Sequence, residues 1–232
     1  MTLSVNTNIG ALIAIQNLTK TAQGLERTQL RITTGLKVNG PKDDASTYAI
    51  AQNQRGDIAG FRSVKTALAA GGSTVNVAIT GGKSISDLLT EMKAKVVQAN
   101  QAGLNAASRT ALNNDFAALR SQIETIVATA EFNGANLITS AATNLTVLST
   151  VDGSTISVSA KSLDSATLVI STATVNLLTS SVAVNTLTAI NSAVVQVSDK
   201  RAALGSAAKR IEVQSEFVVK LVDILQEGVG TL

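Results

Sequence analysis

The 232-residue sequence has no cysteine and no histidine. Without cysteine, the chain forms no disulfide and has no thiolate chemistry. Without histidine, it lacks the commonest general base and metal ligand near neutral pH, which excludes Ser–His, Cys–His and His–metal mechanisms. The H-E-x-x-H helix of metallopeptidases is impossible for the same reason. We therefore predict that the chain is not an enzyme and that it uses no cofactor or metal.

Aromatic side chains are also scarce, at 2% of the sequence, although 45% of the residues are hydrophobic. A core of Ala, Val, Leu and Ile suits close helix-on-helix packing. The net charge is only +3, the basic residues are scattered, and a nucleic-acid surface would need basic and stacking residues together. No run of about 18 apolar residues is present, and the N-terminus does not resemble a signal peptide. We expect neither nucleic-acid nor membrane binding.

Apolar residues at seven-residue spacing, or in alternating steps of four and three, predict long helical segments of coiled-coil type. The first, from about Ser4 to Gly35, carries Leu18, Leu25 and Ile32 at that spacing. In the third, about 108–130, apolar residues recur in steps of four and three. The last segment repeats every seven residues from Ile190 to Leu232, with Val194, Ala208 and Val222 in a second seam. The predicted coiled-coil core is Leu112, Phe116, Leu119, Ile123, Ile126, Val197, Leu204, Ile211, Val218 and Leu225.

The stretch TTGLKVNGPKDDASTYAIAQ, residues 33–52, contains the only proline of the chain and marks the boundary between the first and second helical segments. Gly35 is suited to a left-handed C-cap, and Pro41 disfavours helix at the residue before it. Asp43 and Asp44 then precede a second helical segment, where acidic residues complement the helix dipole. A metal-binding or acid–base pair is the alternative, but adjacent helical residues point in different directions. We interpret the pair as a helix start.

The second helical segment, about 43–102, contains glycine pairs at 71–72 and 81–82. Gly82-Lys83-Ser84 resembles the end of a phosphate-binding P-loop, but that motif needs a glycine at position 77, which is valine. We predict a flexible break between two helical pieces there. After an Asn133-Gly134 turn, the chain becomes rich in Ser and Thr, and we predict two or three short strands with at least one hairpin.

Several of these motifs together resemble the bacterial flagellin family. The N-terminal signature is carried by LRITTGLKVN at residues 30–39, followed by KDDA at 42–45 and AIA at 49–51. The opening SVNTN and the later Glu131-Phe132-Asn133-Gly134 also match that family's pattern. The short middle is similar to the compact flagellins of alphaproteobacteria. The resemblance covers the N-terminal half and the C-terminal helix, and it implies a structural subunit of the flagellar filament, built by coiled-coil packing.

The resemblance implies a mainly α fold, a long antiparallel coiled-coil helical bundle with a small β-hairpin region in the middle of the chain. Residues 1–34 would form the N-terminal core-domain helix, 35–44 a spoke joint, 45–136 the N-terminal part of the rod, 137–181 a short β-rich outer region, and 182–232 the C-terminal rod helix. Residues 143–179 would then face solvent. Related flagellins continue beyond the segment at 227–230 into an amphipathic C-terminal core helix, which we expect to be missing here. The final heptads should then pair with the helical layer after the joint.

The resemblance also implies site residues and partners. Core-domain assembly would use Leu12, Leu18, Leu25 and Ile32. The spoke contacts would use Arg31, Gly35, Leu36, Lys37, Asn39, Lys42, Asp43 and Asp44. The Ser/Thr-rich region offers candidate glycosylation sites at Thr143, Thr146, Ser154, Thr155, Ser165 and Thr172.

The expected partners are other copies of the chain, the flagellar export apparatus and its secretion chaperone, and the hook-associated and cap proteins. The protein would be secreted and would reside in the flagellum. A hook–filament junction protein of the same superfamily is the nearer alternative, since it shares the end helices but is expected to match the EFNG motif poorly. A generic coiled-coil scaffold would explain the heptads but not the joint.

Overall fold

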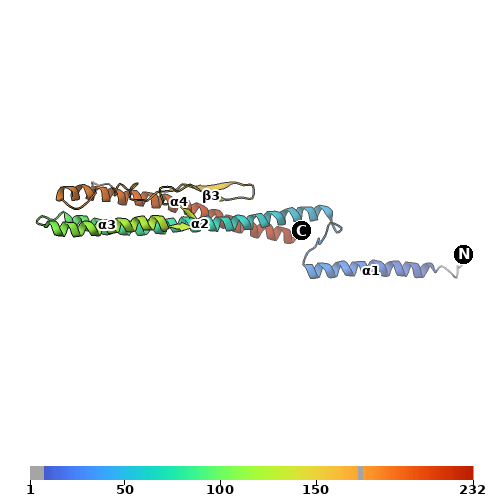
Figure 1. Ribbon diagram of the computed structural model, residues 1–232. Coiled ribbons are helices and arrows are strands. Elements are labelled where there is room, and N and C mark those ends of the chain that lie inside the picture. The colour runs from blue at the N-terminus through green and yellow to red at the C-terminus, as the bar shows by residue number, and fades with distance from the viewer. Residues whose placement is uncertain (1–7, 172–174, 232) are drawn as a thin grey trace. The chain divides into compact units, whose positions relative to one another are not determined.

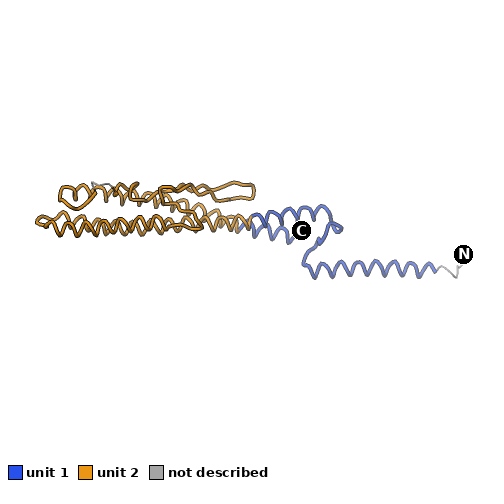
Figure 2. Tube along the Cα trace, in the orientation of Figure 1, with its two compact units in different colours: residues 1–60, 220–232 blue, residues 61–219 orange. Residues whose placement is uncertain are grey.

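The computed structural model describes residues 8–171 and 175–231 (Figure 1). Its helices and strands follow the chain in the order α1 (Ile9–Thr34), α2 (Ala45–Ala99), α3 (Ala106–Thr129), β1 (Glu131–Phe132), β2 (Ala135–Asn136), β3 (Leu145–Leu148), β4 (Thr155–Val158) and α4 (Ser180–Thr231). The chain divides into two compact units (Figure 2). Unit 1 comprises Met1–Gly60 with Lys220–Leu232, and unit 2 comprises Phe61–Val219. The fold is mainly α with a small β region, as the sequence predicted.

Both ends of α1 are capped by the residues that surround it. The Asn8 side chain accepts a hydrogen bond from the backbone N–H of Ala11 at 3.2 Å, which satisfies one of the free donors at the helix start. At the other end, Gly35 has φ 67° and donates its N–H to the carbonyl of Arg31. A left-handed residue at this position closes the helix at little steric cost only if it is glycine. The predicted C-cap is confirmed.

Helix α2 runs without interruption through both glycine pairs, so the predicted flexible break at Gly82 is wrong. At Gly71, Gly81 and Gly82 other parts of unit 2 approach the helix backbone closely, whereas Gly72 has only an ordinary contact. A Cβ added at Gly71 would lie 2.4 Å from Val147 Cγ2, and one added at Gly82 would lie 2.9 Å from Arg201 Cγ. The tertiary contacts thus outweigh the intrinsic cost of glycine in a helix, about 1 kcal/mol each.

Helices α2 and α4 run antiparallel in unit 2, because Gly72 lies against Ile211 and Gly82 against Arg201. The seven-residue repeat of α4 is buried at Ile190, Val197, Leu204, Ile211 and Val218. The second seam differs from the prediction at two of its three positions. Val194 and Ala208 are partly exposed and Ala193 and Ala207 are buried instead, whereas Val222 is buried as predicted. These alanines lie three residues after a core position, on the side of α4 that the 137–179 segment covers.

Among the described residues of unit 1, the buried apolar side chains are Ala51 and Ile58 of α2 and Val222 of α4. The end of α4 is thus grouped with the start of α2, in line with the predicted pairing of the final heptads. Leu225, which we expected in the core, is only partly buried because the buried position of this turn is Val222.

Helix α3 buries a narrower seam than its sequence predicts. Phe116 and Ile123 are buried as expected, and Val127 continues the seam. Leu112, Leu119 and Ile126 are partly exposed, which corrects their assignment to the core. They lie three or four residues from the buried positions and therefore at the edges of the contact.

Two hairpins form the β region. Phe132 pairs with Ala135 across Asn133 and Gly134, which both have positive φ, as a two-residue primed turn requires. The second hairpin pairs β3 with β4 from Leu145↔Val158 to Leu148↔Thr155. The predicted turn and hairpin are confirmed.

The segment 137–179 is not uniformly exposed to solvent, although we expected its residues 143–179 to face solvent. Its apolar side chains are buried against the helices of unit 2, including Leu137, Ile138, Leu163, Leu168, Ile170 and Leu177. The exposed Ser and Thr side chains alternate with them, so the segment is a covering layer with one face in the core.

Candidate assembly site

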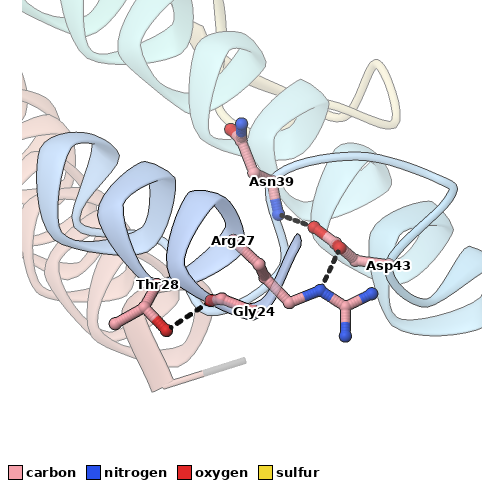
Figure 3. A network of polar contacts seen from close by, with 5 residues as sticks. All are labelled: Gly24, Arg27, Thr28, Asn39 and Asp43. Atoms are coloured by element: carbon pink, nitrogen blue, oxygen red, sulfur yellow. Dashed lines mark hydrogen bonds and ion pairs between the residues drawn. The ribbon is translucent and has the colours of Figure 1, made fainter. Parts of the chain in front are cut away.

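The joint between α1 and α2 is organised around the Asp43 carboxylate, whose side chain is only 19% exposed. Its Oδ1 lies 3.3 Å from Nε of Arg27, and its Oδ2 accepts the backbone N–H of Asn39 at 3.3 Å (Figure 3). One carboxylate therefore links α1 to the loop that follows it. Because Arg27 is more than half exposed, solvent screens this ion pair, and it contributes about 0–1 kcal/mol. Its role is geometric.

The neighbouring Asp44 caps the start of α2. Its Oδ1 accepts the backbone N–H groups of Ser46 at 3.0 Å and Thr47 at 3.2 Å, and its Oδ2 accepts the Thr47 hydroxyl at 2.7 Å. The hydrogen bonds from the Thr47 side chain and backbone lower the pKa of Asp44 below its usual value. The two aspartates face different partners, and Asp44 acts as the predicted helix cap.

The other predicted joint residues are distributed unevenly. Asn39 and Leu36 are half-buried, while Arg31, Lys37 and Lys42 have exposed side chains. Arg31 contributes its backbone carbonyl to the Gly35 cap. Arg27 was missed by sequence reasoning, because nothing in the local pattern pairs it with a residue sixteen positions later. Within the described parts of the chain, no three His, Cys, Asp or Glu side chains are grouped to hold a metal ion.

The outer surface of α1 is apolar and uncovered. None of its residues is buried, and Leu18 and Ile32 are 70% and 78% exposed. Leu12 and Leu25, also predicted assembly residues, are exposed as well. A single helix of this length is marginal in water without a packing partner, and contiguous exposed apolar surface marks an interaction site. The chemistry of α1 is that of a helix that packs against another helix.

In unit 2, three polar side chains of α4 bind the covering layer at intervals of fourteen residues. The Thr186 hydroxyl donates to the carbonyl of Asn176 at 2.9 Å, Lys200 Nζ to that of Ser162 at 2.7 Å, and Gln214 Nε2 to that of Ser149 at 2.9 Å. Burial lowers the pKa of Lys200, and the nearby Asp164 carboxylate opposes this effect. In each case a side chain of α4 donates a hydrogen bond to a backbone carbonyl of the covering layer, whose irregular backbone needs such partners. Sequence reasoning missed them, although they interrupt the apolar repeat regularly.

The candidate glycosylation sites fall into three groups. Thr143, Thr146, Ser154 and Thr155 are exposed. Ser165 is only 6% exposed, and its backbone N–H donates to Glu124 Oε1 at 2.7 Å, so it is inaccessible in the folded unit. Thr172 lies outside the described residues. We therefore retain the four exposed residues as candidates and withdraw Ser165.

The fold and these surfaces define a helical structural subunit, with a packed coiled-coil unit and a separate unpartnered apolar helix. None of the helices in the described residues carries an apolar stretch long enough to cross a membrane. Residues 5–143 match the family model described as the bacterial flagellin N-terminal helical region. The chain belongs to the bacterial flagellin family and is a structural subunit of the flagellar filament.

Full-length relatives and solved structures agree with this assignment. The chain is 40% identical over 229 residues to Flagellin FljK of Caulobacter vibrioides, covering 99% of the chain and 84% of the relative. It is 30% identical over 240 residues to a flagellin of Brucella melitensis, with coverage of 99% and 84%. The crystal structure of Bacillus cereus flagellin superposes with a TM-score of 0.56 at 26% identity, covering 67% of this chain and 88% of the other.

A putative flagellar hook-associated protein from Vibrio parahaemolyticus has a TM-score of 0.68 at 14% identity, covering 83% of this chain and all of the other. At that identity the likeness concerns the fold alone. The junction-protein alternative is no better supported than the flagellin assignment, which rests on the family model and the full-length relatives.

Proposed function

We propose that α1 is the segment through which this subunit is built into the filament core. The observation that supports the proposal is the complete exposure of α1 together with its seven-residue apolar spacing. In the filament, α1 of neighbouring subunits would cover Leu12, Leu18, Leu25 and Ile32. The joint at 35–44 would fix the direction in which the chain leaves this inner layer, with Arg31, Leu36, Lys37 and Lys42 facing neighbouring subunits. Residues 45–136 and 182–232 would form the rod, and 137–181 its outer cover.

Paired charge insertions test the role of α1. In the full-length protein, Leu18→Asp with Leu25→Asp should abolish filaments in a strain that lacks its own flagellins. The matched control, Gln16→Asp with Gln23→Asp, adds the same charges at the same spacing and should leave filaments intact, because residues two apart lie on different sides of a helix. Circular dichroism of both purified monomers checks that unit 2 remains folded. Normal filaments with the leucine variant would refute the proposal.

We further propose that the subunit leaves the cell uncleaved through the flagellar export apparatus, escorted by a secretion chaperone, and is added to the filament beneath cap and hook-associated proteins. Family membership supports this route. N-terminal sequencing of protein taken from filaments should return the sequence that begins Met1-Thr2-Leu3, or Thr2 after removal of the initiator. A start further into the chain would show that a leader had been cleaved, and the export proposal would fail while the assembly proposal stood.

The exposed Ser and Thr side chains of the outer cover are proposed as sites for O-linked sugars. Thr143, Thr146, Ser154 and Thr155 combine accessibility with a position on or beside the β3–β4 hairpin. Intact mass spectrometry of native filament protein should show added mass that the four alanine substitutions remove. An unmodified mass would end the proposal.

A further inference from the structure

One face of α4 presents large apolar side chains to solvent. Val213 is 53% exposed and Phe217 is 56% exposed, four residues apart, and Arg210 precedes Val213 by three. This spacing places Arg210, Val213 and Phe217 on one side of the helix. Of the four phenylalanines in the chain, Phe217 is the most exposed among those whose exposure is given, at 56% against 39% for Phe132. We call this surface the Phe217 face.

A second surface on the same turns of α4 is a groove. It lies between α2 and α4, has a volume of about 670 Å³, and includes Leu68, Gly72, Gly205, Ile211, Glu212 and Glu216 in its lining. The small residues in its lining leave space in the groove, since a Cβ added at Gly205 would meet no atom within 4 Å. Its members on α4, Gly205, Ala208, Glu212 and Glu216, follow steps of three and four, so they share a side that differs from the Phe217 face. We call it the α2–α4 groove.

The Phe217 face projects from the molecule and the α2–α4 groove is concave, and the two carry charged side chains of opposite sign. The Phe217 face carries an aromatic ring beside the cationic Arg210. The lining of the groove includes apolar side chains, two carboxylates and the cation Lys209. Because Lys209 pairs with Glu212 at 2.8 Å, Glu216 is the carboxylate that remains to face Arg210. Buried aromatic and Arg anchors in well-packed pockets dominate the energy of protein interfaces. Because the two surfaces differ, a contact between them on two copies is heterologous, the kind of contact that builds an open helical array when its rotation does not close into a ring.

We propose that Phe217 of one subunit inserts into the α2–α4 groove of a neighbouring subunit, with its Arg210 facing the neighbour's Glu216. The occupant of the groove is thus a second copy of this chain. The proposal rests on the assembly of the chain into filaments and adds the identity of one contact between the rods.

The absence of cysteine from the sequence allows a clean crosslinking test. The full-length protein carrying Phe217→Cys and Gly205→Cys is assembled into filaments, oxidised and separated without reducing agent. We expect a ladder of covalent oligomers, because each subunit would offer one cysteine to each of two neighbours. Phe217→Cys alone should give monomers. The matched control combines Phe217→Cys with Gln122→Cys, an exposed position on α3, and should also give no ladder.

The outcomes are distinguishable. Filaments without a ladder would overturn the groove contact while leaving α1 assembly intact, and a lack of filaments from the unsubstituted protein would instead refute assembly. Efficient dimers from Phe217→Cys alone would show that the Phe217 face contacts the same face of another copy. A crosslinked product that mass spectrometry assigns to another protein would show that a different partner binds there. Either result would overturn the proposal. If the double variant does not assemble, mixed filaments of the two single variants provide the same test, with dimers as the expected product.

A second measurement does not depend on disulfides. Phe217→Ala should raise the critical monomer concentration for filament growth about tenfold, the effect of losing a modest anchor residue. Val195→Ala, which trims another exposed apolar side chain of α4, should leave it unchanged. Equal critical concentrations for the two variants would overturn the proposal.

Discussion

Gly71 and Gly72 are adjacent in α2 but have different surroundings. A methyl group at Gly71 would lie 2.4 Å from Val147 Cγ2, inside the packing of the β3–β4 hairpin, whereas one at Gly72 would lie 3.7 Å from Ile211 Cγ2, an ordinary contact. Substituting each glycine by alanine therefore distinguishes two effects: the gain in helix propensity, which both positions share, and the steric collision, which occurs only at Gly71.

Gly71→Ala should destabilise the protein by up to about 2 kcal/mol, since overpacking costs about 1–3 kcal/mol and the gain in helix propensity returns about 1 kcal/mol. Gly72→Ala should be neutral or stabilising. Urea unfolding of both variants measures the difference. The double variant Gly71→Ala with Val147→Ala should lose less stability than the sum of the two single losses, because Val147→Ala removes the colliding methyl groups. A loss equal to that sum would contradict this account.

Asp44 predicts a pH-dependent stability. Its folded-state pKa is lowered by the hydrogen bonds from Thr47 and Ser46, so its contribution is present above the usual aspartate pKa and is lost as the pH falls through the lower, folded-state value. Asp44→Ala should therefore unfold at a lower temperature than the natural protein at neutral pH, and the gap should narrow in strong acid. Asp44→Asn, which still caps the helix, serves as the control. A gap that widened in acid would contradict the assignment.

At the scale of elements, α3 shows how two neighbouring apolar positions differ. Ile123 is buried and Leu119 is partly exposed. Ile123→Ala should cost about 2–5 kcal/mol because it leaves a cavity. Leu119→Ala, which we would have expected from the sequence to cost as much, should cost only about 1 kcal/mol, in proportion to the apolar area it buries. Equal losses in chemical denaturation would show that both residues face the core.

The sequence predicts such elements well and their contacts less well. The seven-residue spacing of α4 identified Val197, Leu204, Ile211 and Val218 as core because a strict repeat specifies one face of a helix. The sequence pattern could not identify Gly71 and Gly82 as sites where another segment approaches the helix closely. The approaching residues, Val147 and Arg201, are distant from them in the chain. For the same reason the joint's cap residues were predictable from local pattern, whereas the Arg27–Asp43 pair was not.

At the scale of the molecule, the contrast between α1 and unit 2 predicts two levels of protection. In the isolated monomer, backbone amides around Leu12 to Leu25 should exchange with solvent much faster than those around Leu112 to Ile126, because no residue of α1 is buried. Hydrogen exchange measured by mass spectrometry provides the test, and assembled filaments provide the control, in which α1 should become protected. Equal protection in the monomer would show that the joint does not separate a weak layer from a stable one.

The antiparallel pairing of α2 with α4 also has a consequence for the timing of folding. Gly72 meets Ile211 and Gly82 meets Arg201, pairs that are well over a hundred residues apart in the chain. During synthesis the side of α2 that carries Gly72 and Gly82 therefore waits for its α4 partner until residues 201–211 have been made, and contacts of such long sequence separation form slowly. Until then the pairing of α2 with α4 cannot form, which gives any factor that binds unfolded polypeptide time to capture the growing chain before the rod closes.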